Sequence, residues 1–294
     1  MMTTALLFQT TAIPQASFAF LPSEPAQLQS PYRSPIGFEE VPLQIRAGKL
    51  LVQAVMNADT GLFIVDTGAP SLIVNRTPQP AGEGKAYSIS NSFAAEPVVV
   101  DRLQLPGYQG RQLDAYAVDL SHLEKAVGKP ILGMIGHSIL RDFCIFIDFA
   151  ESRFFLRRQT QWPAAAGHQL LLSIEQDLPI VEGVIGGERV RFIVDLGTRD
   201  NILDTRLETS AAFLPTGTAR LQGLDQAKEL VTTGEIDQLQ LGPLTLPAAP
   251  FLLANLQQLQ TVTGLQIDGI LGYSFFRNYR LVIDYPNSTL HLLP

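Results

Sequence analysis

The stretch L-F-I-V-D-T-G-A-P-S-L-I-V-N, residues 62–75, recurs later in the same chain as R-F-I-V-D-L-G-T-R-D-N-I-L-D, residues 191–204. A gapless alignment of the two stretches superposes Asp66 on Asp195, and each aspartate is followed two places later by a glycine. In both stretches an apolar strand ends in a carboxylate and then enters a glycine turn. We therefore interpret the chain as an internal duplication that delivers one carboxylate from each half.

A second pair of matching segments lies further along the chain. Residues 135–156 align without a gap with residues 271–292. The recurring residues are Gly136 and Gly272, Ser138 and Ser274, Arg141 and Arg277, Ile147 and Ile283, Asp148 and Asp284, Ser152 and Ser288, and Leu156 and Leu292. The first pair of segments is offset by 129 positions and the second by 136, so the later copy carries seven more residues between them. Insertions of this size belong in loops.

A duplicated carboxylate can meet its own copy across a pseudo-twofold axis. Two carboxylates that share a site separate their pKa values, so that one acts as a base and the other as an acid. This is the chemistry of water-mediated peptide hydrolysis. A single Asp-x-Gly is an ordinary turn sequence, and it is the duplication within a longer apolar frame that favours Asp66 and Asp195 as a catalytic pair.

These motifs resemble those of a known family. The strand that ends in Asp-Thr-Gly at residues 66–68, and the two apolar residues and a glycine at 134–136 and 270–272, resemble the aspartic peptidases, especially the bacterial retropepsin-like aspartyl proteases. The segment D-G-I-L-G-Y-S-F-F-R-N-Y-R-L-V-I-D-Y, residues 268–285, is similar to the pattern that ends a lobe in those families. The resemblance covers most of the chain.

The resemblance implies an all-β fold of two retropepsin-like lobes related by a pseudo-twofold axis, and the activity of an aspartic-type endopeptidase. It implies Asp66 and Asp195 as the catalytic residues, with no metal and no organic cofactor. The expected organisation is a leader or signal segment at 1–37, a first lobe at 38–158, a linker at 159–169 and a second lobe at 170–294.

The loops that support the two aspartates are not equivalent. Their remaining residues are Thr67, Gly68 and Ala69 in the first lobe, and Leu196, Gly197 and Thr198 in the second. In the family, a hydroxyl at the middle position of each motif donates across the lobe interface to backbone of the other loop. Thr67 supplies such a hydroxyl, whereas Leu196 does not. Thr198 is expected to donate instead to an outer oxygen of Asp195, and the second loop is therefore half degenerate.

Composition limits the possible partners. A length of 294 residues with 46% hydrophobic side chains is enough for two buried cores, and a net charge of −7 argues against nucleic acid as a partner. The four histidines show no metal-ligand spacing, and Cys144, the only cysteine, is expected to be a buried thiol. We expect an extended peptide or unfolded protein as substrate, no membrane span, and a monomer, with a dimer left open.

The N-terminus has two interpretations. Residues 1–20 contain a short apolar patch and a possible cleavage site at Ser17–Ala19, which favours a secretory signal and an extracytoplasmic protein. The alternative is a disordered leader, since prolines recur up to Pro35 and no basic residue precedes Arg33. The compartment stays open.

Short β runs dominate the pattern of hydrophobic residues. The expected strands are Val41–Ile45, Leu50–Met56, Leu62–Val65, Val98–Leu105, Ala115–Asp119 and Cys144–Phe149. The expected helices are Ser121–Val127, Ser138–Asp142, Leu256–Thr261 and Ser274–Asn278. Two hairpins that fold over a substrate are expected at Ala86–Val100 and Thr218–Val231.

Two alternatives to a single-chain peptidase remain. Leu196 favours a binding or structural protein that keeps the fold and has lost turnover. In the other alternative, the intact loop around Asp66 pairs with the same loop of a second molecule.

Overall fold

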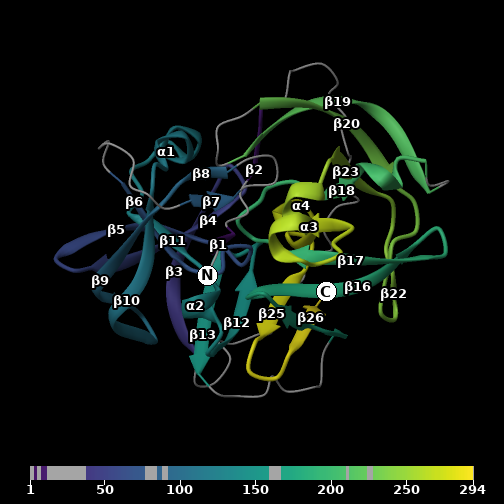
Figure 1. Cartoon of the computed structure of the whole chain (residues 1–294). Helices are drawn as coiled ribbons and strands as arrows, with labels where there is room; N and C mark the ends of the chain where they lie inside the picture. Colours follow the sequence, from purple (N-terminus) through teal and green to yellow (C-terminus); the bar gives the residue numbers. More distant parts are fainter. Residues whose placement is uncertain are drawn as a thin grey trace.

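The computed structural model describes residues 3–4, 8–11, 38–76, 85–87, 92–158, 167–209, 212–223 and 228–293. Strands dominate these residues, so the predicted all-β fold is confirmed. The described residues form two β lobes that lie side by side (Figure 1). None of the helices within these ranges is long and apolar enough to cross a membrane.

The first lobe contains β3 (Glu39–Arg46), β4 (Lys49–Met56), β5 (Asp59–Val65), β6 (Leu72–Asn75), β7 (Lys85–Tyr87), β8 (Ser92–Ala94), β9 (Glu96–Leu105), β10 (Tyr108–Val118), β11 (Gly133–Ile135), β12 (Phe143–Asp148) and β13 (Arg153–Arg158). Its helices are α1 (Ser121–Val127) and α2 (His137–Leu140). Six strands close into a barrel in the order β4-β5-β11-β6-β10-β9, because β9 pairs back onto β4. The closed barrel has no free edge there and encloses an apolar core.

The second lobe contains β14 (His168–Leu171), β15 (Ser173–Glu175), β16 (Leu178–Ile185), β17 (Glu188–Val194), β18 (Ile202–Asp204), β19 (Phe213–Gly223), β20 (Lys228–Ile236), β21 (Gln240–Leu241), β22 (Leu244–Thr245), β23 (Ala249–Ala254), β24 (Gly269–Leu271), β25 (Arg280–Asp284) and β26 (Thr289–Leu293). Its helical pieces are η1 (Thr205–Leu207), α3 (Gln257–Thr263) and α4 (Tyr273–Phe276). Two short N-terminal strands, β1 (Thr3–Thr4) and β2 (Phe8–Thr11), pair with β7 and β19 respectively.

The two lobes repeat the same local structure around each aspartate. β11 pairs in parallel with β5, with Ile135 opposite Val65, and β24 pairs in parallel with β17, with Leu271 opposite Val194. The helices that follow, α2 and α4, both begin after a glycine with φ of −103°. Identical pairing at aligned positions is what the repeated sequence segments predict.

A shared sheet joins the lobes. β12 of the first lobe pairs antiparallel with β25 of the second, and Figure 1 shows these strands meeting at the lower centre. Phe146 lies opposite Val282, which is also its aligned counterpart in the other copy. The pairing is therefore symmetric about this residue pair, and the pseudo-twofold axis passes through it. The predicted relation between the lobes is confirmed.

Glycine is required at positions 136 and 272 for a steric reason. A Cβ atom on Gly136 would lie 2.3 Å from the carbonyl oxygen of Ala69, and one on Gly272 would lie 2.5 Å from that of Asp200. Such contacts are far inside van der Waals distance, so the backbone of the aspartate loop must move if either glycine gains a side chain. These glycines allow the segment after β11 or β24 to pass directly beneath an aspartate loop.

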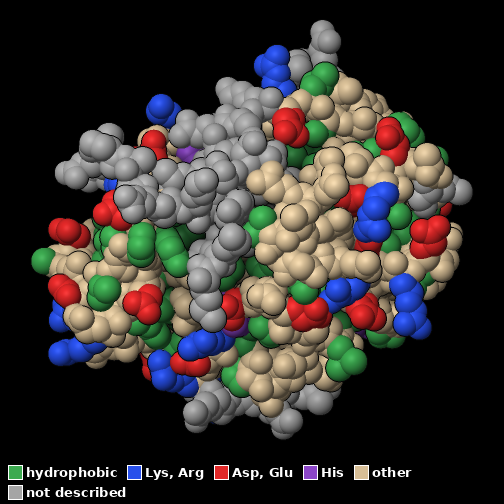
Figure 2. Space-filling view, in the orientation of Figure 1, with side chains coloured by type: hydrophobic (Ala, Val, Ile, Leu, Met, Phe, Trp, Pro, Cys, Tyr) green, Lys and Arg blue, Asp and Glu red, His purple; other side chains and the backbone are tan. Residues whose placement is uncertain are grey.

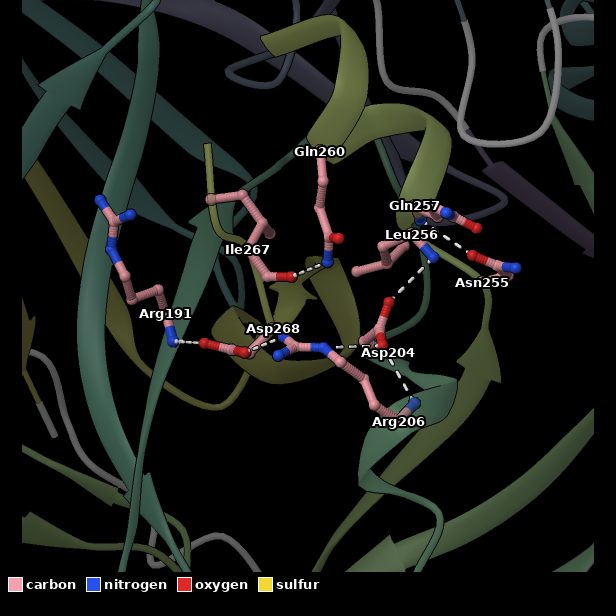
Figure 3. A network of polar contacts seen from close by, with 9 residues as sticks. All are labelled: Arg191, Asp204, Arg206, Asn255, Leu256, Gln257, Gln260, Ile267 and Asp268. Carbon is pink, nitrogen blue, oxygen red and sulfur yellow. Dashed lines mark hydrogen bonds and ion pairs between the residues drawn. The ribbon is translucent and has the colours of Figure 1, made fainter. Parts of the chain in front are cut away.

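Polar side chains of the second lobe hold its outer elements together, as Figure 3 shows. Asp204 accepts hydrogen bonds from the backbone nitrogens of Leu256 and Arg206, both at 3.0 Å. Asp268 accepts from the backbone nitrogen of Arg191 at 2.7 Å and forms an ion pair with Arg206. These carboxylates are satisfied by backbone and arginine donors, so the network is structural and fixes α3 and η1 against β17.

The expected elements are present with small shifts. Every strand expected in the first lobe falls within β3, β4, β5, β9, β10 or β12, give or take one residue. α1 has the predicted bounds, α2 and α4 begin one residue early, and α3 begins one residue late. Both seven-residue helices, α1 and α3, end at a glycine with φ of 70°, which satisfies the last carbonyls in a left-handed cap. Cys144 is buried as expected.

The first hairpin differs from its prediction. β7 pairs with β8 through Tyr87 and Ser92, but residues 96–100 of the predicted range belong to the long strand β9. The second hairpin, β19 with β20, is longer than predicted and spans Phe213–Ile236. The turns of both hairpins, residues 88–91 and 224–227, lie outside the described residues, as do most of the predicted leader and residues 159–166 of the predicted linker.

The shared sheet generates a prediction about stability. Ile147 is fully buried in β12 and pairs with Leu281 of the second lobe. We expect Ile147→Ala to lower the free energy of unfolding by about 2–5 kcal/mol, because it leaves a cavity at the junction. Since both lobes share this sheet, they should still unfold in one transition in a chemical denaturation experiment followed by circular dichroism. Val99→Ala is the control, because Val99 is 56% exposed and should change stability little. Two separate transitions would contradict the shared sheet as the link between lobes.

Candidate functional site

Each predicted aspartate follows directly from a central strand. The backbone nitrogen of Asp66 donates to the carbonyl of Ile135 at 3.0 Å, and that of Asp195 donates to Leu271 at 2.9 Å. These bonds continue the parallel pairing with β11 and β24 for one more residue and hold both loops at the strand ends. The glycine two places on then donates its backbone N–H to the inner carboxyl oxygen, at 3.0 Å for Gly68 and 2.7 Å for Gly197.

The structure brings the two carboxyl groups together. The carboxyl groups of Asp66 and Asp195 lie close enough to interact, and both residues are 0% exposed. Each also packs against the glycine of the opposite loop: a Cβ atom on Gly68 would lie 2.5 Å from the Asp195 carboxyl carbon, and one on Gly197 would lie 2.2 Å from an Asp66 oxygen. Among the described residues, no group donates to the Oδ2 atom of either aspartate. The two carboxyls therefore lie close enough to raise or lower each other's pKa.

The two carboxyls have different surroundings. Burial, then the charge of Asp195 and its hydrogen bond, raise the pKa of Asp66 well above the usual aspartate value. Burial also raises the pKa of Asp195, to about 6, but Lys49, the hydrogen bond from Asp66 and two backbone N–H groups oppose that rise. These opposing contributions make Asp195 the more readily ionised of the two carboxyls.

The loops are joined by one threonine. The hydroxyl of Thr67 donates to the carbonyl of Val194 at 2.7 Å and accepts from the backbone nitrogen of Leu196 at 2.9 Å. This is the cross-lobe bond that the resemblance implies for Thr67. The Leu196 side chain is fully buried in the apolar core and returns no such bond. The first lobe therefore anchors the loop of the second, without reciprocity.

The predictions for the next position are only partly right. The backbone nitrogen of Thr198 donates to Asp195 at 3.2 Å, but its hydroxyl has no partner among the described residues, so the expected hydroxyl bond to Asp195 is wrong. The methyl group of Thr198 faces Gly272 instead, which turns the hydroxyl away. Ala69 is fully buried, and its carbonyl accepts from the backbone nitrogen of His137 at 2.7 Å.

Sequence analysis missed Lys49. This lysine begins β4, is 1% exposed, and its Nζ donates to the carbonyl of Gly197 at 2.5 Å. The available signal was a charged residue at the start of the apolar run Leu50–Val52, at a position where the other copy has Leu178.

Tyr285 was also missed. It is buried close to the two aspartates, and its hydroxyl has no partner among the described residues. Burial and then the charges of Asp66 and Asp195 raise the pKa of Tyr285. Its ring packs at 5.4 Å from that of His137, which is buried and lies 3.2 Å from Asp177. His137 therefore belongs to the packing beneath the site.

The described residues offer no cluster of three or more His, Cys, Asp or Glu side chains that could hold a metal ion. The chemistry available at this site is that of two carboxyls with unequal affinity for one proton, supported by backbone donors and one buried ammonium group.

The raised pKa values predict how stability changes with pH. A folded state that holds aspartate pKa values above the ordinary 3.8 binds more protons than the unfolded state, so its stability falls as pH rises from about 4 to about 6. Asp66→Asn removes one of these groups. We therefore expect the unfolding free energy of the wild type, measured relative to that of Asp66→Asn by urea denaturation, to decrease over this pH range. The exposed Asp59, changed to Asn, should show no such trend. A difference that is constant with pH would contradict the raised pKa values.

Comparison with known proteins supports the same reading. The sequence model of the aspartyl protease family matches residues 181–275, which include Asp195 and its loop. No curated protein matches the chain. Together with the all-β fold of two related lobes, the family match, which lies within the second lobe, supports an aspartyl protease family, retropepsin-like in kind.

Proposed function

We propose that the protein is an aspartic peptidase in which Asp66 and Asp195 of one chain activate a water molecule. The observation that carries this proposal is the pair of fully buried carboxyls at the ends of equivalent strands, each packed against the glycine of the opposite loop. Asp195 takes a proton from the water as its oxygen attacks the peptide carbonyl carbon, while protonated Asp66 donates to the carbonyl oxygen. Return of a proton to the amide nitrogen then breaks the carbon–nitrogen bond.

The proposed substrate is an extended peptide or a segment of unfolded protein. The hairpins β7–β8 and β19–β20 offer backbone that can pair with such a strand. Since both carboxyls are inaccessible to solvent, the groups around them must move to admit the peptide. On the face shown in Figure 2, acidic side chains are interspersed with basic ones over the described residues, which suits a peptide better than a polyanion.

The alternative of a binding protein rests on Leu196, whose side chain cannot donate across the interface. The alternative of paired first lobes from two molecules is less well supported, because Asp66 already meets Asp195 within one chain.

Removal of either carboxyl tests the proposal. We expect Asp66→Asn and Asp195→Asn each to lower cleavage of an unfolded protein by about 10²–10⁴-fold or more, because each supplies half of one acid–base pair. The double variant should be no worse than either single one. The wild-type rate should follow a bell-shaped pH profile set by the pair. The exposed Asp59, changed to Asn, is the control. Activity retained in Asp195→Asn would favour pairing of first lobes between molecules, and an inactive wild type would favour the binding protein.

The degenerate loop gives a second test. We expect Leu196→Thr to raise the cleavage rate, because a hydroxyl there would restore the reciprocal bond and hold Asp195 against Asp66. The matched control is Leu196→Val, which has the shape of threonine without the hydroxyl and should show no gain. Since Leu196 is fully buried, both variants should lose about 1–3 kcal/mol of stability, measured by denaturation. Equal rates in the two variants would mean that the missing hydroxyl does not limit catalysis.

A further inference from the structure

Lys49 lies at the contact between the first lobe and the aspartate loop of the second. It follows the tight β3–β4 turn, where Ala47 and Gly48 have φ values of 49° and 73°. Gly48 packs against the Arg199 side chain so closely that a Cβ atom there would lie 2.5 Å from it. The turn therefore directs the lysine stem toward Gly197, whose carbonyl accepts from its Nζ at 2.5 Å.

The two lobes have different residues at the position of Lys49. The counterpart of Lys49 in the second copy is Leu178, which is fully buried in an apolar cluster. A leucine satisfies this buried position by packing alone, whereas a buried ammonium group loses its hydration and needs compensating charges. The ammonium group of Lys49 therefore needs compensating charges close to it, which Leu178 does not need.

Those charges belong to the dyad and its neighbours. Burial lowers the pKa of Lys49 to about 8, and the charges of Asp195, Asp66 and Asp200 oppose this while Arg199 adds to it. At neutral pH most molecules therefore keep the ammonium form. In the proposed mechanism the two carboxyls share one proton and carry one negative charge, so that together with the ammonium group they form a buried set with no net charge.

We propose that Lys49 is a positioning residue of the dyad: its buried ammonium group ties the second aspartate loop to the first lobe and keeps one of the two carboxyls ionised. The proposal rests on the proposed function, since it concerns the same two carboxyls. It also explains how a second loop without a reciprocal hydroxyl stays in place. Thr67 and Lys49 both reach from the first lobe, and both bind backbone of the second loop.

The test is the pH at which the dyad first loses a proton. Lys49→Met keeps the length and apolar stem of the side chain and removes its charge. A neighbouring opposite charge lowers a carboxyl pKa by about 1–3 units. In Lys49→Met, the rise of the cleavage rate on the acidic side of its pH profile should therefore move to a pH about 1–3 units higher. Lys125→Met is the matched control, because Lys125 is exposed on α1, and its profile should equal that of the wild type. A merely structural lysine would change the rate without moving this rise to higher pH.

A second measurement does not depend on turnover. Carbon-13 NMR of the aspartate carboxyls, with signals assigned through Asp66→Asn and Asp195→Asn, reports the same titration directly. The proposal is supported if the first midpoint of this titration, counted from low pH, lies at higher pH in Lys49→Met than in the wild type. An unchanged midpoint overturns it. If the wild type cleaves nothing, the proposed function is wrong. The NMR titration still tests whether Lys49 lowers the pKa of the dyad. If Lys49→Met does not fold, Lys49→Leu, which copies Leu178, takes its place in the titration.

Discussion

The two aspartate loops pack against each other so closely that neither of their glycines has room for a Cβ atom. Gly68 lies against the carboxyl of Asp195, and Gly197 lies against that of Asp66. This contact requires both loops to leave equivalent strands at the same height, which the symmetric pairing of β12 with β25 provides. It also buries both carboxyls, and burial is the main reason that their pKa values rise.

The backbone is nearly symmetric around this contact, whereas the side chains are not. Thr67 bonds to the backbone of the opposite loop, while Leu196 packs into the apolar core. Lys49 places a charge beside the dyad where its counterpart Leu178 places none. Both of these side-chain differences lie next to the two carboxyls. The carboxyls therefore have different surroundings although their strands and turns are alike. In the proposed mechanism, the charge of Lys49 and the backbone N–H groups around Asp195 favour ionisation of that carboxyl.

Sequence reasoning worked best where the signal was local or repeated. Strand runs, the bounds of α1 and the symmetric lobes follow from hydrophobic periodicity and from the two matching segments. The predictions were less accurate where pairing with a distant strand sets the bounds of an element. β9 extends back to Glu96 because it pairs along its length with β10, where Glu96 lies opposite Ala117, and the first hairpin is therefore shorter than predicted. The hydroxyl of Thr198 was misplaced because its direction depends on packing against Gly272.

The sequence by itself determined that two carboxylates end equivalent strands, because a duplicated motif keeps its order, spacing and strand period. Only the tertiary structure decided which groups surround them and how their pKa values shift. Lys49 and Gly197 are 148 positions apart, and nothing local to either residue indicates that they meet. Their contact depends on how the β3–β4 turn packs onto the second lobe, and the pKa values depend on burial that exists only once both lobes have folded together.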